Sequence, residues 1–272
     1  MKDILFEVEN QIATLTLNRP NALNAFSMEM IHDWISYLEE VRDSDDIRVL
    51  VLTGNGKAFC AGGDLKTMLQ GEGFVKQNED NKVDMTSTGM ARKNSLWKYI
   101  QRIPLLMQEI DKPVIAAING DAVGAGLDMA LMCDLRFASS TARLGEGYIK
   151  VGLVPGDGGA YFLPRIVGID KALELLWTGD LLSAEEAKEI GLITYVESPD
   201  ELMKKVYALS ERLANNPQSA IRIMKRAVYQ GLNMELRTTL DMISSQMGLV
   251  TELPDFKEGV QAILDKRKPN FG

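Results

Sequence analysis

Apolar and polar residues follow distinct patterns in the first fifty positions. Residues 12–17 (IATLTL) alternate and are rich in β-branched residues, which predicts a strand. Residues 49–54 (VLVLTG) form an apolar run that ends in glycine, as expected of a buried strand followed by a turn. Between them, Ser27 is the predicted cap of a helix whose apolar residues recur at helical spacing: Met30, Ile31, Trp34, Ile35, Leu38 and Val41. We therefore expect a hairpin, a helix and a strand.

A similar unit recurs later in the chain, where residues 112–138 predict a strand, a glycine-rich turn, a helix and a strand. This repetition favours one α/β core over separate lobes. Helical patterns dominate the C-terminal third, and Gly191 and Gly231 stand where helix C-caps are expected. We predict a core over residues 1–196 and a helical region over residues 197–272 that carries subunit contacts.

Charge, cysteine and histidine content narrow the possible functions. Asp and Glu outnumber Lys and Arg by 38 to 30, a net charge of −8 that argues against a nucleic-acid partner. Cys60 and Cys133 are too few for a disulfide framework and lack metal-ligand spacing. A single histidine, His32, argues against a Ser-His-Asp hydrolase and a histidine-rich metal site. Without a signal-peptide pattern or an apolar run of transmembrane length, we expect a cytoplasmic protein with no membrane partner.

Small residues gather in two places that follow predicted strands. Residues 59–65 read FCAGGDL, and residues 119–128 read NGDAVGAGLD. The second cluster lacks the G-x-G-x-x-G spacing of a dinucleotide-binding loop. A plain turn is the alternative interpretation of the first cluster. Two strand-to-helix turns with bare backbones, however, can aim two N–H groups at one oxygen and stabilise an oxyanion.

Longer segments carry a more specific signal: LNRPNALNAFS, VLTGNGKAFCAGGDL, KPVIAAINGDAVGAGLDMALMCDLRFAS, GLVPGDGG, TGDLLSAEEAKEIGLI and DFKEGVQAILDKRKPNF. Together, and in this order over nearly the whole chain, they resemble the crotonase superfamily of enoyl-CoA hydratases and isomerases. The resemblance implies an α/β fold, with a crotonase-like core of repeated ββα units forming a spiral and a C-terminal helical oligomerisation region. It also implies an acyl-CoA thioester substrate, no cofactor beyond the coenzyme A of that substrate, and a homotrimer or dimer of trimers.

The resemblance assigns individual residues to the thioester and to CoA. The positions of Gly63 and Ala125 match the two family positions whose main-chain N–H groups form the oxyanion hole, which would explain the small side chains around them. Other positions match segments that surround CoA, and Lys266 matches a basic position that can reach the CoA of a neighbouring subunit. The matching CoA positions are Ala22, Leu23, Ala61, Asp64 and Leu65.

The acid and base positions depart from the two glutamates of the family's hydratases. The first position holds Asp128, which is one carbon shorter, on the same helix face as Ala125. The second holds Tyr148, a poor base at neutral pH that could still orient substrate or water. Two further candidates stand close by. Glu146 would share the face of Tyr148 if that segment is extended, or serve only as a structural hydrogen-bonding group. Asp157 could transfer protons, form a turn or cap a helix.

The leading interpretation is an enzyme that hydrates an enoyl-CoA through an enolate held by Gly63 and Ala125. Isomerisation of the double bond is the alternative within the same class. Because Tyr148 replaces an acid, a catalytically inactive CoA-binding subunit is the alternative from another class. The polar stretch Gly71–Met90 is expected to be a mobile flap that orders over bound substrate.

Overall fold

The computed structural model describes residues 2–69 and 88–271. The predicted flap over residues 71–90 therefore lies outside the described residues, except for its last three positions. A six-stranded sheet forms the centre of the molecule, in the order β1-β2-β3-β5-β7-β10. Only β1 and β2 pair antiparallel, as the predicted hairpin, and the other neighbours are parallel. The strands are β1 (Ile4–Glu9), β2 (Ile12–Leu17), β3 (Val49–Gly54), β5 (Val114–Ile118), β7 (Leu135–Ser139) and β10 (Tyr195–Glu197).

A smaller four-stranded sheet, in the order β4-β6-β8-β9, is built from short strands. In three consecutive units, a strand of the large sheet is followed by a strand of the small one: β3 by β4, β5 by β6, and β7 by β8. This is the predicted repeat, with a third copy that the sequence patterns did not reveal. The strands are β4 (Ala58–Cys60), β6 (Asp121–Val123), β8 (Arg143–Gly145) and β9 (Leu182–Ser183).

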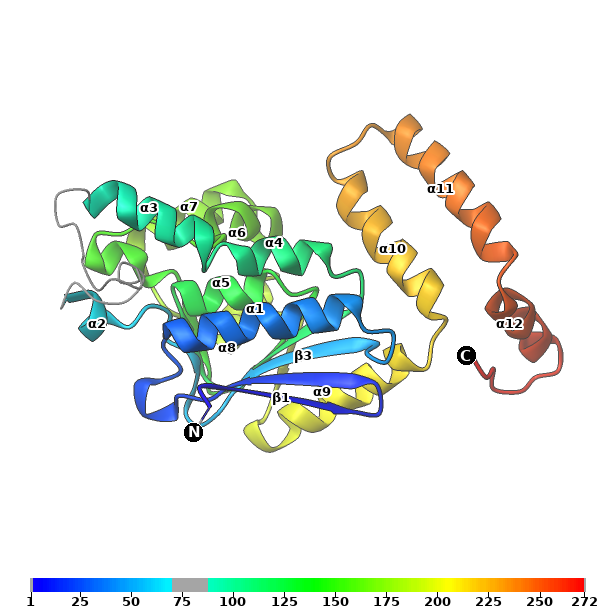
Figure 1. Ribbon diagram of the computed structural model, residues 1–272, viewed down its shortest axis with the longest axis horizontal. Helices are drawn as coiled ribbons and strands as arrows, with labels where there is room; N and C mark the ends of the chain where they lie inside the picture. Colours follow the sequence, from blue (N-terminus) through cyan, green and yellow to red (C-terminus); the bar gives the residue numbers. More distant parts are fainter. Residues whose placement is uncertain (1, 70–87, 272) are drawn as a thin grey trace.

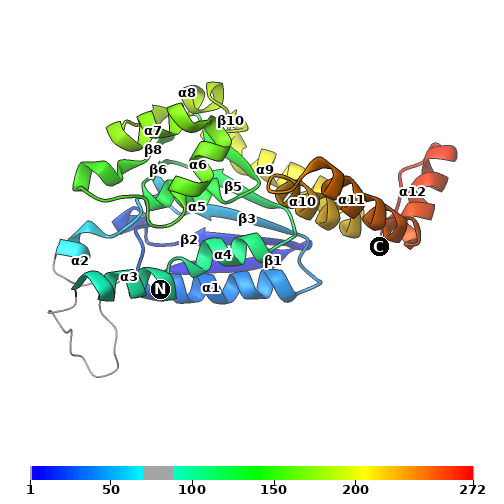
Figure 2. The same ribbon diagram turned by 90° about the horizontal axis from the view of Figure 1, so that it is seen from above.

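Helices cover both faces of the large sheet (Figures 1 and 2). In β3, Leu50 and Leu52 face the cluster of α1 (Met28–Asp43) and α4 (Arg102–Glu109), whereas Val49 and Val51 face α9 (Pro199–Ala214). The predicted cap is confirmed, because Ser27 Oγ accepts a hydrogen bond from Met30 N–H at 3.0 Å. The remaining elements of this part are η1 (Pro20–Ala22), α2 (Leu65–Leu69), α3 (Thr88–Lys98), α5 (Ala125–Leu131), η3 (Gly147–Val151), α6 (Gly159–Val167), α7 (Ile169–Thr178) and α8 (Ala184–Glu189).

The last three helices extend away from the sheets: α10 (Gln218–Gly231), α11 (Leu236–Thr251) and α12 (Pro254–Leu264) (Figures 1 and 2). Ion pairs tie α10 to the core, with Lys225 Nζ 2.7 Å from Asp134 and Arg222 Nε 2.7 Å from Asp111. Gly191 follows α8 with a left-handed φ of +77°, as predicted of a C-cap glycine. The prediction for Gly231 is wrong, because Leu232 N–H still bonds to Val228 and α10 therefore runs through Gly231. Among the described helices, none has the length and apolar composition needed to cross a bilayer.

Candidate active site

The two glycine-rich turns lie against each other. Parallel pairing of β4 with β6 places Cys60 beside Ala122, so the turns that follow these strands are neighbours. Gly62 has a left-handed φ of +79°, which favours glycine. A Cβ on Gly62 would lie 3.0 Å from the Val123 carbonyl oxygen and 3.1 Å from the Ala125 nitrogen. Close contact between the two turns therefore requires a residue without a side chain at position 62.

Within these turns, Gly63 and Ala125 have uncommitted N–H groups. The preceding N–H groups are used, since that of Gly62 donates to Cys60 Sγ at 3.3 Å and that of Gly124 donates to the Gly145 carbonyl at 2.8 Å. In residues 2–69 and 88–271, no acceptor is bonded to the N–H of Gly63 or of Ala125. Ala125 is the first residue of α5, where a helical N–H has no intrahelical partner. The two turns thus each hold one backbone N–H group without an acceptor in the described part of the chain.

Asp128, Tyr148 and Asp157 meet through one hydroxyl group. Asp128 comes from α5, Tyr148 from η3 and Asp157 from the turn before α6. The Tyr148 hydroxyl donates to Asp128 Oδ2 at 2.6 Å and lies 3.2 Å from Asp157 Oδ2. A tyrosine has one hydroxyl hydrogen, so both contacts are hydrogen bonds at once only when one of the two carboxyls is protonated and donates to Tyr148. The alternative role of Asp157 as a helix cap is wrong, because Gly158 is the N-cap of α6 and no side chain caps that helix.

Glu146 completes a group of four that we call the acid cluster: Asp128, Glu146, Tyr148 and Asp157. Its side chain is fully buried, with both oxygens unpaired among the described residues. Glu146 and Tyr148 were expected to share a face only if their segment is extended, and that condition is not met because a 3-10 helix begins at Gly147. They nevertheless reach the same cluster, since the hydroxyl of Tyr148 bonds to Asp128 and the carboxyl of Glu146 affects the pKa of Asp128.

Burial is the largest influence on every pKa in the acid cluster. It raises the pKa of Asp157 to about 6, although the hydrogen bond from Tyr148 acts in the opposite direction. Burial also raises the pKa of Asp128, and burial together with the Asp128 charge raises the pKa of Glu146. The pKa of Tyr148 is raised too, so this phenol stays protonated. Because like charges in a dry site oppose each other's ionisation, the cluster retains protons at neutral pH.

The predicted CoA positions divide into two groups. Five of them lie at or beside the first turn, where Ala61 N–H donates to the Leu23 carbonyl at 3.0 Å and Asp64 accepts from Lys66 N–H at 3.2 Å. The side chains of Leu23 and Leu65 are 48% and 57% exposed and form an apolar rim there. Ala22 ends η1, next to Leu23. Lys266 instead follows α12, which Figure 1 places at the opposite end of the molecule from α2.

Two residues that support the first turn were not predicted to do so. Asn24 is fully buried, and its side chain donates to the carbonyls of Ala58 at 2.8 Å and Phe59 at 3.1 Å. Cys60 Sγ donates to the Asn24 carbonyl at 3.1 Å while it accepts from Gly62. Burial raises the pKa of the Cys60 thiol to about 12, so it is no nucleophile at neutral pH. Asparagine tolerates a positive φ, and the φ of Asn24 is +56°. Its residue type was therefore the sequence signal that could have marked Asn24 as part of a turn.

A hollow of about 640 Å³ follows α3, with a lining that includes Arg92, Lys93, Leu96 and Trp97. Gln101, also in this lining, donates from Nε2 to the Gly156 carbonyl at 2.8 Å. Since Gly156 precedes Asp157, the hollow lies alongside the turn that carries one member of the acid cluster. Its volume falls within the roughly 300–1,000 Å³ of ordinary small-molecule sites.

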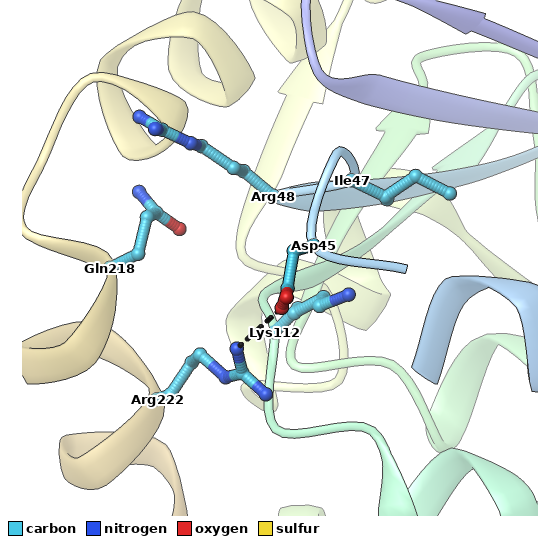
Figure 3. A pocket seen from close by; sticks show the side chains of 6 residues that line it. All are labelled: Asp45, Ile47, Arg48, Lys112, Gln218 and Arg222. Carbon is cyan, nitrogen blue, oxygen red and sulfur yellow. Dashed lines mark ion pairs between the residues drawn. The ribbon is translucent and has the colours of Figure 1, made fainter. Parts of the chain in front are cut away.

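Another hollow, of about 130 Å³, lies between the core and α10 (Figure 3). Its cations are committed to structural contacts. Lys112 Nζ donates to the carbonyls of Val41 and Ser44, and Arg222 pairs with Asp111 at 2.7 Å and Asp45 at 3.9 Å. The lining also contains Arg48, which comes immediately before β3, whereas the glycine turns follow the small-sheet strands. This hollow is therefore a structural junction.

Comparison with known proteins matches residues 7–272 to the family described as enoyl-CoA hydratase/isomerase. The chain is 34% identical over 271 residues to the crotonyl-CoA hydratase of Syntrophomonas wolfei, covering 99% of this chain and 98% of the relative. It is 36% identical over 271 residues to the 1,2-epoxyphenylacetyl-CoA isomerase of Escherichia coli K12, covering 100% of this chain and 98% of the relative. The crystal structure of enoyl-CoA hydratase from Bacillus anthracis superposes with a TM-score of 0.87 at 33% identity, covering 99% of this chain and 98% of that one.

Proposed function

Since the chain belongs to the enoyl-CoA hydratase/isomerase family and is an acyl-CoA-processing enzyme, we propose that it adds water across the double bond of an enoyl-CoA. The family and the crotonase fold predicted from the six segments are confirmed by these matches. The observation that carries the proposed reaction is the pair of uncommitted N–H groups on Gly63 and Ala125, next to a cluster of protonatable side chains.

The thioester carbonyl oxygen binds between these two N–H groups. As water adds, negative charge moves onto that oxygen, and donors already aimed at it stabilise the enolate without reorganising. Each such donor typically contributes about 2.7–4 kcal/mol to transition-state stabilisation. The acyl group continues past the turns toward the hollow along α3, which adjoins Gly156.

Asp128, Tyr148 and Asp157 move the proton. The oxygen of water bonds to the β-carbon, and one of its protons passes to the ionised Asp128 and then through Tyr148 to Asp157, which delivers a proton to the α-carbon. Tyr148 links the two carboxyls, accepting a proton from Asp128 as it donates its own to Asp157, so tyrosinate does not accumulate. The cluster ends the cycle with the same number of protons. Asp128 serves as the principal base because Tyr148 donates to it at the shorter distance, 2.6 Å, and thus favours its ionised form.

CoA binds at the rim formed by Ala22, Leu23, Ala61, Asp64 and Leu65, while Lys266 acts on the CoA of a neighbouring copy. That role for Lys266 requires assembly, and we propose a homotrimer or dimer of trimers. Its support is an exposed apolar stripe on α11, where the exposed fractions range from 56% to 73%: Leu236, Leu240 and Met247. Such a stripe on a projecting helix is typical of a protein interface.

A panel of α,β-enoyl-CoA and β,γ-enoyl-CoA thioesters tests the reaction, with turnover followed by the ultraviolet absorbance of the conjugated thioester. Asp128→Asn preserves shape and removes the base, so kcat should fall by roughly 10²–10⁴ while CoA affinity, measured by calorimetry, stays unchanged. The exposed Asp200→Asn is the matched control and should keep full activity. Full turnover by Asp128→Asn, or no turnover of any substrate by the wild type, would refute the proposal.

Isomerisation is a second candidate because of the Tyr148 bridge between two carboxyls. A proton taken from the α-carbon of a β,γ-enoyl-CoA could be returned to the γ-carbon through the same chain of groups. The resulting conjugation increases absorbance, whereas hydration removes it. The direction of the absorbance change therefore separates the two reactions, and either one excludes an inactive CoA-binding subunit.

A further inference from the structure

Glu146 is the one carboxyl in the acid cluster to which the proposed reaction assigns no step. Its side chain is 0% exposed, and neither of its oxygens has a hydrogen-bond partner in the described part of the chain. The same holds for Oδ1 of Asp128. Buried oxygens that have lost hydration require a hydrogen bond in return. A hydrogen on one of these two carboxyls can satisfy an oxygen on each.

The residues on both sides of Glu146 pack against the chain that enters α5, the helix that carries Asp128. The preceding residue, Gly145, accepts the Gly124 N–H at 2.8 Å at the start of α5. The following residue, Gly147, lies so close to Val123 that a Cβ would be 2.8 Å from its Cγ1 atom. With both neighbours packed against the chain that enters α5, the Glu146 carboxyl lies where a hydrogen bond with Asp128 affects the pKa of both groups.

Two ionised carboxylates have no hydrogen to share, so this contact is stable only when one of them is protonated. Tyr148 decides which one. Its hydroxyl already donates to Asp128 Oδ2 at 2.6 Å, which favours the ionised form of Asp128. Glu146 has no such donor in the described structure. The hydrogen therefore belongs on Glu146, which donates it to the Asp128 carboxylate.

We propose that Glu146 is a positioning residue that remains a neutral carboxylic acid and donates a hydrogen bond to Asp128. Asp128 then accepts hydrogen bonds from both Tyr148 and Glu146, which fixes the orientation of the carboxylate and keeps it ionised. Glu146 itself contacts no substrate. The catalytic part of the inference rests on the proposed function of Asp128, but the protonation of Glu146 does not.

Other titratable groups face Glu146 from three elements: Asp128 of α5, Asp157 from the turn before α6, and Tyr148 of η3. Burial and the charges of both aspartates raise the pKa of Glu146 far above its ordinary range. At alkaline pH, loss of the Glu146 proton removes a donor from Asp128 and adds a like charge beside it. Activity should therefore fall on the alkaline side because of Glu146.

Glu146→Gln and Glu146→Met separate donation from packing. Glutamine still donates to Asp128, so we expect kcat/KM within about threefold of wild type and loss of the alkaline decline. Methionine fills a similar volume without donating. Because a hydrogen bond to a charged group is lost, the acidic limb of kcat/KM should move up by about one to two pH units. If Glu146 served only to fill space, both variants would change KM or thermal unfolding, and the acidic and alkaline limbs of the pH profile would stay where they are. That result would overturn the proposal.

Infrared spectroscopy tests the protonation of Glu146 in free enzyme, without any substrate. At pH 8 the wild type should show the C=O stretch of a protonated buried carboxyl, and Glu146→Gln should lose it. Asp157→Asn is the control and should keep the band, because Asp157, with a pKa of about 6, is ionised at pH 8. A wild type without the band overturns the inference. Loss of turnover in Glu146→Gln as complete as in Asp128→Asn also overturns it, since Glu146 would then transfer the proton itself. If the protein does not hydrate enoyl-CoA but the infrared band behaves as expected, the proposed function is wrong and the protonation of Glu146 is still supported.

Discussion

Substitution of Gly62 by alanine tests whether contact between the two glycine turns sets the oxyanion geometry. The added Cβ would lie 3.0 Å from the Val123 carbonyl oxygen, 3.1 Å from the Ala125 nitrogen and 3.3 Å from the Ala125 Cβ. All three atoms belong to the entry of α5, so relief of this contact moves the Ala125 N–H away from the Gly63 N–H. The change adds no charge and leaves the acid cluster intact.

The expected effect of Gly62→Ala has two parts, a loss of folding stability and a loss of kcat. Placing a non-glycine residue at φ +79° costs about 1–2 kcal/mol, which lowers the melting temperature by a few degrees in a chain of this size. Complete loss of one oxyanion donor lowers kcat by roughly 10²–10³. Since the turns need to separate by only a few tenths of an ångström, we expect a partial loss, about 10- to 100-fold in kcat.

Gly191→Ala supplies the matched control. Gly191 has nearly the same left-handed angle, φ +77°, but nothing lies within 4 Å of a Cβ placed there. Both variants should lose similar stability in thermal unfolding, and only Gly62→Ala should lose kcat in the hydration assay. If both variants keep wild-type kcat, the two turns do not set the catalytic geometry. If both lose it equally, the effect is one of general stability.

Two further predictions concern stability and assembly. Burial raises the pKa of Asp157 from 3.8 to about 6, so the folded state binds more protons than the unfolded state over this window and stability falls as pH rises through it. At about 1.36 kcal/mol per pKa unit, Asp157→Asn should increase the free energy of unfolding by up to about 3 kcal/mol above pH 6 and should not change it below about pH 4. Equal shifts in melting temperature at pH 4 and pH 8 would contradict this. On α11, Leu240→Glu combined with Met247→Glu should dissociate the assembly in sedimentation velocity, whereas the exposed Ser245→Glu should not. A wild type that is already monomeric at micromolar concentration would remove the basis for the assembly.

Much of the large sheet could be predicted from sequence, whereas the small sheet could not. The alternation over β2, the apolar run over β3 and the spacing of Trp34 and Leu38 are local signals, and each produced the expected element. Strands β4, β6 and β8 have three residues each, too few to show a period. Their existence depends on pairing between distant segments, such as Cys60 with Ala122. The third repeat was missed for this reason.

The candidate site shows the same division between local and distant information. The family motifs located Asp128, Tyr148 and the two N–H donors, but they could not show how Asp157 reaches Tyr148 from the turn before α6. A shared face for Glu146 and Tyr148 depended on an extended segment, whereas the structure has a 3-10 helix that starts at Gly147. The support of the first turn by Asn24 involves side-chain bonds to residues 34 and 35 positions away, which no local pattern contains.

The proposed role of the acid cluster in proton transfer would explain why these side chains are kept where they weaken the fold. Asp128, Glu146 and Asp157 are each at most 7% exposed, and burial opposes the ionisation of all of them. A purely structural core would place apolar side chains there, because buried polar groups with unpaired oxygens destabilise the folded state. Proton transfer at neutral pH, by contrast, requires groups whose pKa values lie far above those of free carboxylic acids. The Tyr148 bridge then separates their roles, since the carboxyl that receives its hydrogen is favoured as base and Glu146 keeps its proton. Tyr148, at the position where the family's hydratases carry a glutamate, is therefore compatible with the proposed catalysis, provided that Asp157 supplies the second carboxyl and Glu146 supplies a hydrogen bond to Asp128.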